Sequence, residues 1–263
     1  MSFPRGRESS FAGVMRRPAS FLGSRLRGND EFFQIPSAMI QAIVTDIEGT
    51  TSSIDFVHQS LFPYARDNMR AFLRAYANRP EVAAQLHETA RLERRQLTWE
   101  DASEVLQRWI GEDRKYTPLK TLQGMIWAQG YAAGELKGHV YPDTPVYLRR
   151  WHEQGRKLYV YSSGSVEAQQ LIFGHSDAGD LTPLFSGYFD TRIGAKREAG
   201  SYSAILKELA LPGEQVLFLS DVGEELDAAR SAGLHTCQLL RDDKAKPFEQ
   251  HPQARDFAEV KVL

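Results

Sequence analysis

The sequence of 263 residues has a single cysteine, Cys237, and no apolar run long enough to cross a membrane. One cysteine cannot form an internal disulfide, which fits a reducing compartment, so we expect a cytoplasmic protein and interpret Cys237 as a small buried hydrophobic residue. A membrane helix needs about 20 consecutive, mainly apolar residues. We therefore expect a soluble protein with no membrane partner.

The sequence also has little net charge, −2 at neutral pH, from 32 basic and 34 acidic residues. Domains that bind nucleic acids are usually basic, so this balance argues against a nucleic-acid partner. Hydrophobic residues make up 42% and charged residues 25% of the chain, which is ordinary for a globular protein. The length allows one large domain or two modest ones, and we expect a monomer.

Residues 1–38 lack the apolar periodicity of a folded segment. They carry six arginines against three acidic residues, with glycines and prolines scattered among them. We expect a disordered extension, with folding beginning at Met39, which is also a candidate start codon. The arginines and serines are typical of a transit peptide, but the glycines and prolines would interrupt the amphipathic helix that such a peptide needs.

Strand patterns are also missing between residues 54 and 139. Apolar residues instead recur at helical spacing in four stretches, at 64–77, 81–95, 101–109 and 117–131. Four amphipathic helices with short connections predict a small helical bundle.

From residue 140 onward, short apolar runs alternate with amphipathic stretches. Strands are predicted at 157–161, 215–219 and 235–240, in addition to the apolar run that ends at Asp46. This alternation predicts an α/β fold, a Rossmann-like parallel sheet with helices on both faces. We expect residues 39–53 and 140–263 to form this core, with residues 54–139 inserted as a helical cap.

Polar side chains follow three of the expected strands. Asp46 and Glu48 follow the first, Ser162 and Ser163 another, and Asp221 a third. In open parallel sheets, ligands bind at the carboxyl ends of the strands. Because two neighbouring carboxylates raise each other's pKa unless a cation lies between them, Asp46 and Glu48 indicate a metal site. The alternative is a polar turn in which Asp46 only caps the next helix.

A phosphate monoester would suit this edge of the sheet. Asp46 could attack phosphorus, with Mg²⁺ held by Asp46 and Asp221 to neutralise the spreading charge. The Ser162 hydroxyl and the amides of the turn around Gly164 suit phosphoryl oxygens, because they lie at a helix amino terminus. Lys196 is the candidate for a further cation. Taken singly, each of these residues also fits a helix cap or, for Lys196, a solvated lysine.

Four stretches carry a family resemblance: Val-Thr-Asp-Ile-Glu-Gly-Thr-Thr at 44–51, His-Val-Tyr-Pro-Asp at 139–143, Tyr-Ser-Ser-Gly-Ser-Val-Glu-Ala-Gln at 161–169, and Phe-Asp-Thr at 189–191 with Lys196. They resemble the haloacid dehalogenase-like phosphatase superfamily and, more narrowly, the enolase-phosphatase E1 family of methionine salvage. The resemblance runs from residue 39 to the end of the chain.

The resemblance implies that Asp46 is the nucleophile and a magnesium ligand. It implies that Glu48 is the general acid and base, with its backbone carbonyl at the metal, and that Asp221 is the third metal ligand. Ser162 and Ser163 match the substrate-contacting pair, and Lys196 matches the phosphate-side lysine. Most of the superfamily has aspartate where this chain has Glu48, whereas the narrower family has glutamate.

The implied reaction is enolisation of a small phosphorylated substrate, 2,3-diketo-5-methylthiopentyl-1-phosphate, followed by dephosphorylation to an acireductone. The base that removes the carbon-bound proton is left open between Glu48 and a cap residue. One alternative function is that of another capped, magnesium-dependent phosphatase. A second alternative is a receiver-like signalling module that holds phosphate on an aspartate, although such a module has no reason to insert helices after its first acidic loop.

Overall fold

A computed structural model describes residues 40–242, 245–260 and 262. The prediction of a disordered extension over residues 1–38, and of Met39 as its boundary, lies outside the described residues. The strands are β1 (Ala42–Thr45), β2 (Lys157–Tyr161), β3 (Phe185–Phe189), β4 (Val216–Ser220), β5 (His235–Leu239) and β6 (Gln253–Ala254). They form a sheet in the order β3-β2-β1-β4-β5-β6, and each neighbouring pair is parallel.

The helices are α1 (Ile54–Phe56), α2 (Phe62–Tyr76), α3 (Pro80–Glu93), α4 (Trp99–Gly111), α5 (Thr117–Ala132), α6 (Thr144–Glu153), α7 (Val166–Gly174), α8 (Ala199–Leu209) and α9 (Gly223–Ser231). A π-helical turn, Val57–Leu61, joins α1 to α2, and short 3-10 turns precede β3 and β4. None of the helices in the described ranges is long and apolar enough to cross a membrane.

Strand β1 lies inside the sheet, and all of its residues are buried. At its end, Thr45 pairs with Val160 of β2 on one side and with Leu219 of β4 on the other. A parallel strand covered on both faces needs a continuous apolar run, which explains the sequence of β1. Because β1, β2 and β4 end side by side, the residues that follow them meet at one edge of the sheet.

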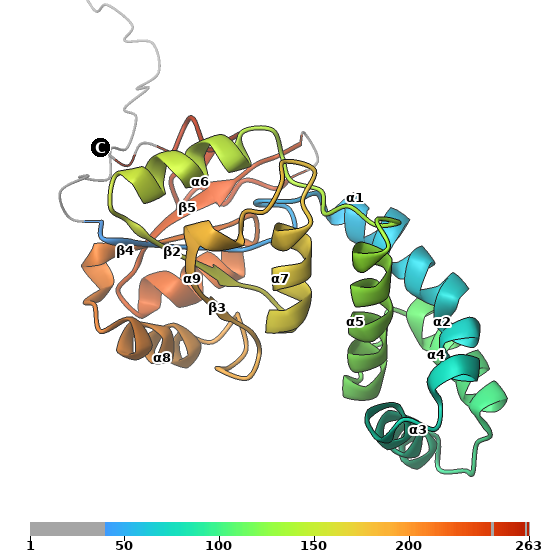
Figure 1. Cartoon of the computed structure of the whole chain (residues 1–263). Helices are drawn as coiled ribbons and strands as arrows, with labels where there is room; N and C mark the ends of the chain where they lie inside the picture. Colours follow the sequence, from blue (N-terminus) through green and yellow to red (C-terminus); the bar gives the residue numbers. More distant parts are fainter. Residues whose placement is uncertain (1–39, 243–244, 261, 263) are drawn as a thin grey trace, which may run out of the picture. The chain divides into compact units, whose positions relative to one another are not determined.

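Helices cover both faces of the sheet (Figure 1). On one face, Trp151 of α6 packs in a cluster with Leu217 of β4. On the other face, Tyr202 of α8 and Leu226 of α9 pack with Phe218 of β4. Adjacent residues of β4 therefore point to opposite layers, as the alternation of side chains along a strand requires. These layers confirm the predicted α/β fold with helices on both faces.

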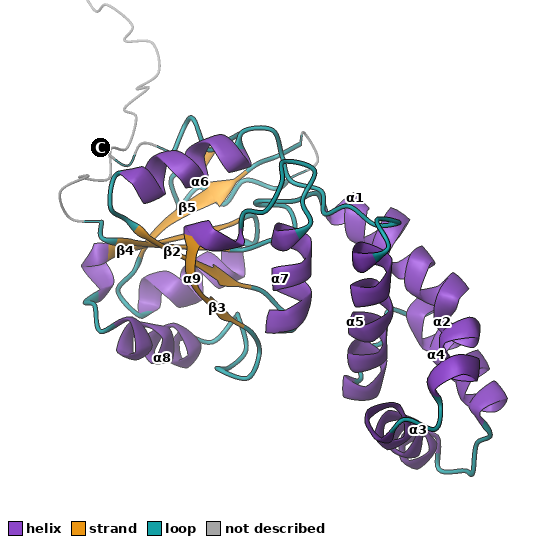
Figure 2. Cartoon of the chain, viewed as in Figure 1, coloured by secondary structure: helices purple, strands orange, loops and turns teal. Residues whose placement is uncertain are grey.

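The segment from α1 to α5 follows β1 and is helical, whereas the strands lie elsewhere in the chain (Figure 2). Its core contains the buried residues Met69, Leu73, Leu106 and Leu122. These residues come from α2, α4 and α5, so the inserted helices have a core of their own. This confirms an inserted helical cap, while the limits given for it, residues 54–139, stay a prediction.

Two strands of the sheet are not predicted from the sequence. Strand β3 contains Gly187 and is mostly half-buried, so it lacks the apolar run typical of a buried strand. A side chain at Gly187 would approach the Tyr159 ring to 3.2 Å, which explains why glycine suits this position. Strand β6 has only two residues, Gln253 and Ala254, too few to give a periodic signal. Cys237 is buried on β5, as expected.

Candidate active site

A tight turn after β1 presents the first acidic residue. Asp46 follows β1 and is only 3% exposed, and its Oδ1 accepts a hydrogen bond of 2.8 Å from the Ile47 amide. The amides of residues 50–52 all donate to the Ile47 carbonyl, which curls the chain back on itself. Gly49 adopts φ +72°, and a side chain there would lie 2.3 Å from Oδ2 of Asp221. Glycine suits this position because the backbone is left-handed and because the Asp221 carboxylate leaves no space for a side chain.

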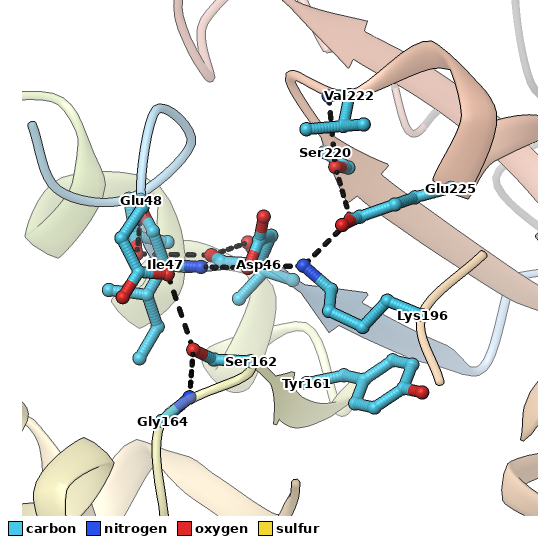
Figure 3. A network of polar contacts seen from close by, with 12 residues as sticks. Asp46, Ile47, Glu48, Tyr161, Ser162, Gly164, Lys196, Ser220, Val222 and Glu225 are labelled. Carbon is cyan, nitrogen blue, oxygen red and sulfur yellow. Dashed lines mark hydrogen bonds and ion pairs between the residues drawn. The ribbon is translucent and has the colours of Figure 1, made fainter. Parts of the chain in front are cut away.

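Lys196 joins two carboxylates at this edge (Figure 3). Its Nζ lies 2.7 Å from Oδ1 of Asp46 and 2.6 Å from Oε2 of Glu225, and its side chain is 10% exposed. Glu225, near the start of α9, also accepts a hydrogen bond of 2.9 Å from the Ser220 hydroxyl. Burial opposes the charge of Lys196, but the Asp46 and Glu225 carboxylates outweigh it and raise the pKa of the lysine. Lys196 is therefore a permanent cation beside Asp46.

Three hydroxyl groups fix the loop that carries Lys196. The Tyr202 hydroxyl donates to the Lys196 carbonyl at 2.7 Å, and the Ser201 hydroxyl donates to the Ala195 carbonyl at 2.7 Å. The Tyr161 hydroxyl donates to the Gly194 carbonyl at 3.0 Å. Hydroxyl groups from β2 and α8 thus bind the carbonyl groups of residues 194–196. These bonds fix the backbone that carries the Lys196 ammonium group.

Glu48 and Ser162 approach each other from the ends of β1 and β2. The Ser162 hydroxyl donates to Oε2 of Glu48 at 3.2 Å and accepts a hydrogen bond of 3.1 Å from the Gly164 amide (Figure 3). The predicted helix amino terminus is present, because Ser165 caps α7 by accepting from the Ala168 amide. The Gly164 amide, predicted to bind a phosphoryl oxygen, is thus directed at Ser162 in this structure.

Burial shapes the acidity of the surrounding carboxyl groups. Burial, and then the neighbouring Asp46 charge, raise the pKa of Glu48 and of Glu225 above the ordinary range. The same two causes raise the pKa of Asp221 to about 7. A carboxyl group with such a pKa can take up and release a proton near neutral pH, as general acids and bases do. A bound cation would reverse these shifts by favouring the charged forms.

Asp221 has the features of a metal ligand. Its Oδ1 is buried and accepts no hydrogen bond from any described residue. Buried polar atoms are rarely left without a partner, so this oxygen fits a metal that supplies one. Asp46 is the neighbouring carboxylate whose charge raises the Asp221 pKa. Mg²⁺ is usually held by one or two carboxylates together with water and substrate phosphate, which matches this pair.

Glu48, predicted to bind the metal through its backbone carbonyl, directs its side chain at Ser162. Over the described ranges, no group of three or more histidine, cysteine, aspartate or glutamate side chains could hold a metal ion. Asp46 and Asp221 therefore remain the candidate side-chain ligands, and the backbone carbonyl of Glu48 remains a predicted one. The ligand set and the catalytic roles stay predictions.

A cavity of about 350 Å³ opens beside Glu48 and Ser162. Its core wall includes the turn between β2 and α7, residues 162–165. Its cap wall comes from the helical insertion and combines apolar side chains with polar ones, which are Asp113, Arg114, Lys115, Lys120 and Gln123. The apolar residues on the cap wall are Val57, Leu61, Phe62, Ile110, Leu119 and Trp127. The cavity suits a small molecule with one polar end and one apolar end.

Sequence reasoning missed two contributions to this site. The first is the ion pair between Glu225 and Lys196, because the resemblance implies only that Glu225 is a second acidic position. The second is Arg241, whose Nη2 donates to the Thr50 carbonyl at 2.6 Å and whose Nη1 donates to Oδ1 of Asp143 at 2.8 Å. Arg241 lies in a polar segment without periodicity, so no local signal could have identified it.

Comparisons with known proteins agree with this geometry. Residues 40–233 match the family model of haloacid dehalogenase-like hydrolases. The chain is similar to enolase-phosphatase E1 of Serratia proteamaculans, with 56% identity over 84% of this chain and 97% of the relative. It is likewise similar to enolase-phosphatase E1 of Hahella chejuensis, with 57% identity over 85% of this chain and 96% of that protein.

Solved structures give the same fold. The UTR4 protein of Saccharomyces cerevisiae has a TM-score of 0.69 and 30% identity, over 83% of this chain and 98% of that chain. CbbY of Rhodobacter sphaeroides, solved in complex with phosphate, has a TM-score of 0.53 and 19% identity, over 84% of this chain and 96% of that chain. The second likeness concerns the fold alone.

Proposed function

The chain belongs to the haloacid dehalogenase-like hydrolases and, within them, to the enolase-phosphatase E1 family, and we propose that it performs the two-step reaction of methionine salvage. It enolises 2,3-diketo-5-methylthiopentyl-1-phosphate and then removes the phosphate to give the acireductone, as a magnesium-dependent cytoplasmic monomer. The observation that carries the proposal is the convergence of Asp46, Lys196 and Asp221 at one edge of the sheet.

Asp46 is the nucleophile of the phosphatase step. Its Oδ1 accepts from the Ile47 amide and pairs with Lys196, which leaves Oδ2 for attack on phosphorus. The new Oδ2–P bond forms as the P–O bond to the substrate breaks, and Glu48 protonates the departing oxygen. Water then attacks the aspartyl-phosphate, gives its proton to Glu48, and releases phosphate with Asp46 restored.

The surrounding residues hold the phosphoryl group and its charge. Ser162, Ser163 and the Gly164 amide would bind phosphoryl oxygens once substrate displaces the internal hydrogen bond of that turn. Lys196 pairs with Asp46 and orients its carboxylate. Asp46, Asp221 and the Glu48 carbonyl would hold Mg²⁺, which supplies positive charge to the phosphoryl group. Metal dependence is general in this superfamily, and magnesium is the proposed metal.

Glu48 is also the base of the enolisation step. An acireductone carries an enediol beside a ketone, so the proton must leave C1, the carbon that bears the phosphate. Glu48 lines the cavity and accepts a hydrogen bond from Ser162, so its carboxylate lies where it can take up the C1 proton of a bound substrate. The proton it takes from C1 is then available for the departing oxygen in the phosphatase step. One carboxyl group thus serves both halves of the reaction.

The deciding experiment follows the enol absorbance and free phosphate together, using the diketo phosphate with Mg²⁺ and with a chelator. We expect both signals from the wild type with Mg²⁺, and neither from Glu48→Gln. Asp46→Asn should abolish phosphate release from p-nitrophenyl phosphate as well. Release from p-nitrophenyl phosphate without any change in the diketo phosphate would identify another capped phosphatase. A stable phosphoprotein would identify a receiver.

A further inference from the structure

Lys120, on the cap helix α5, places a cation on the wall of the substrate cavity. Its Nζ donates to the Ser163 carbonyl at 2.8 Å, and no other described residue accepts a hydrogen bond from it. A lysine ammonium group has three N–H donors, so two remain for a ligand. This contact joins the cap to the turn that the proposed function assigns to substrate.

Lys120 lies near Glu48, the proposed base, because both contact the turn that carries Ser162 and Ser163. Ser163 follows Ser162 directly in the chain, and the Ser162 hydroxyl donates to the Glu48 carboxylate. Lys120 therefore approaches the residues next to Glu48 from the opposite wall of the cavity. Glu48 and Lys120 both line the cavity, so a substrate that enters it lies within reach of both side chains.

Lys120 differs from the other cations that line this cavity. Arg114 pairs with Glu112 at 2.9 Å, and Lys115 pairs with Asp113 at 2.5 Å. Lys120 is half-buried and forms no ion pair with the described residues. Burial, opposed by Asp190 and assisted by Lys115, lowers the pKa of Lys120. A less strongly held proton makes its ammonium group a better hydrogen-bond donor to a developing negative charge.

We propose that Lys120 is the electrophilic catalytic residue of the enolisation step, donating a hydrogen bond to the C2 oxygen of the substrate. This role rests on the proposed function. The C1–H bond breaks, its proton goes to Glu48, and its electron pair forms the C1=C2 bond. The electron pair of the C2 carbonyl moves onto oxygen, where Lys120 stabilises the charge until the oxygen takes a proton from water.

The proposal predicts a selective loss of activity. Phosphate release from p-nitrophenyl phosphate involves no enolate, so it should not need Lys120 as an electrophile. Removal of one preorganised donor to a developing oxyanion typically lowers the rate by about 10²–10³-fold. Loss of Lys120 should therefore lower turnover of the diketo phosphate far more than turnover of p-nitrophenyl phosphate.

The test compares Lys120→Met with Lys120→Arg, which keeps the charge, and with Lys207→Met, which removes an exposed lysine at the end of α8. For Lys120→Met, we expect enol formation and the exchange of C1 protons with D₂O, followed by NMR, to fall by about 10²–10³-fold. Its release of phosphate from p-nitrophenyl phosphate should fall by a much smaller factor, because that reaction forms no enolate and loses only the contact between Lys120 and the Ser163 turn. Lys120→Arg should recover part of the enolisation, and Lys207→Met should match the wild type.

Three outcomes would overturn this role. Unchanged enolisation in Lys120→Met would show that the ammonium group is not the electrophile. An equal loss on both substrates would show that Lys120 only supports the Ser163 turn. A wild-type enzyme that hydrolyses p-nitrophenyl phosphate but leaves the diketo phosphate unchanged would overturn the proposed function itself, and with it the role of Lys120. Equal melting temperatures of wild type and variants exclude misfolding.

Discussion

The two walls of the cavity are built differently. On the core side, directly before the cavity-lining residues Ile47 and Glu48, buried charged groups contact one another at short distances, as Lys196 does with Asp46 and Glu225. On the cap wall, apolar side chains alternate with charged ones, and Lys120 donates a hydrogen bond to a backbone carbonyl and to no other described residue. The core side is therefore organised for phosphoryl transfer, whereas the cap wall contacts the rest of the substrate and, in our proposal, supplies Lys120 to the enolisation. Substitutions on the two walls should affect different kinetic quantities.

The largest effect is expected from Lys196→Met. Its loss removes the cation beside the nucleophile, so turnover of both substrates should fall by at least about 10³-fold. It also leaves the buried Asp46 and Glu225 carboxylates without a counter-charge, and breaking a buried ion pair costs about 3–5 kcal/mol of unfolding free energy. Steady-state kinetics and urea denaturation would measure both effects. Retention of activity on either substrate would contradict the division between the walls.

Gly49→Ala should come next. Both Gly49 and Gly134 adopt positive φ, +72° and +74°, but a side chain at Gly134 meets no atom within 4 Å, whereas one at Gly49 meets Asp221. Each substitution should cost about 1–2 kcal/mol of unfolding free energy from backbone strain. Only Gly49→Ala should lower activity, by about 10²-fold, because it displaces a proposed metal ligand. Kinetics and Mg²⁺ titrations of both variants measure this, and equal activities would refute it.

On the cap wall, Val57→Ala should act on selectivity. The lost methyl groups remove apolar contact with the methylthio end of the diketo phosphate, so its kcat/KM should fall by about 10-fold. Turnover of p-nitrophenyl phosphate should stay within about twofold of the wild type. Val146→Ala, at an exposed position of α6, is the matched control. A similar fall for both substrates would assign Val57 to the chemistry instead.

The smallest effect concerns a buried histidine away from both walls. His251 contacts Thr236 at 2.9 Å and Asp227 at 3.2 Å, and burial followed by Arg230 lowers its pKa. The folded state thus binds this proton less readily than the unfolded state. Stability from this group is complete above the unfolded pKa, about 6.5, and falls as the pH drops below it.

The melting temperature of His251→Gln should therefore decrease less than that of the wild type between pH 7.5 and pH 5. Differential scanning fluorimetry measures this difference, and catalytic activity at pH 7.5 should be unchanged. An identical decrease in the two proteins would show that His251 does not contribute.

The sequence predicted the residues at the strand ends because parallel strands bring their carboxyl ends to one edge. That rule was sufficient for Asp46, Ser162 and Asp221, each of which follows a buried apolar run. It could not identify Glu225 as the partner of Lys196, since this pair joins a loop to a helix through tertiary packing. The contact between Lys120 and the Ser163 turn could not be predicted either. It joins the cap to the core and appears only when the chain is folded.

Strand β3 was missed for a related reason. Its half-buried sequence has Gly187 in place of an apolar residue, and the close approach of Tyr159 explains that glycine. The spacing of apolar residues indicates which side chains of a segment are buried. Strand β3 instead forms because it pairs with β2. The cap helices were predicted well because each carries its own apolar stripe, which is a local property.

The contact between Arg241 and the Thr50 carbonyl links positions 191 residues apart. On the ribosome, the acidic turn is among the first described segments to emerge, yet this contact cannot form until residue 241 has been made. Asp143, which also binds Arg241, is likewise available long before its partner. The nucleophile therefore acquires its full support only near the end of synthesis. A chain released before residue 241 would lack the contacts of Arg241 with the Thr50 carbonyl and with Asp143.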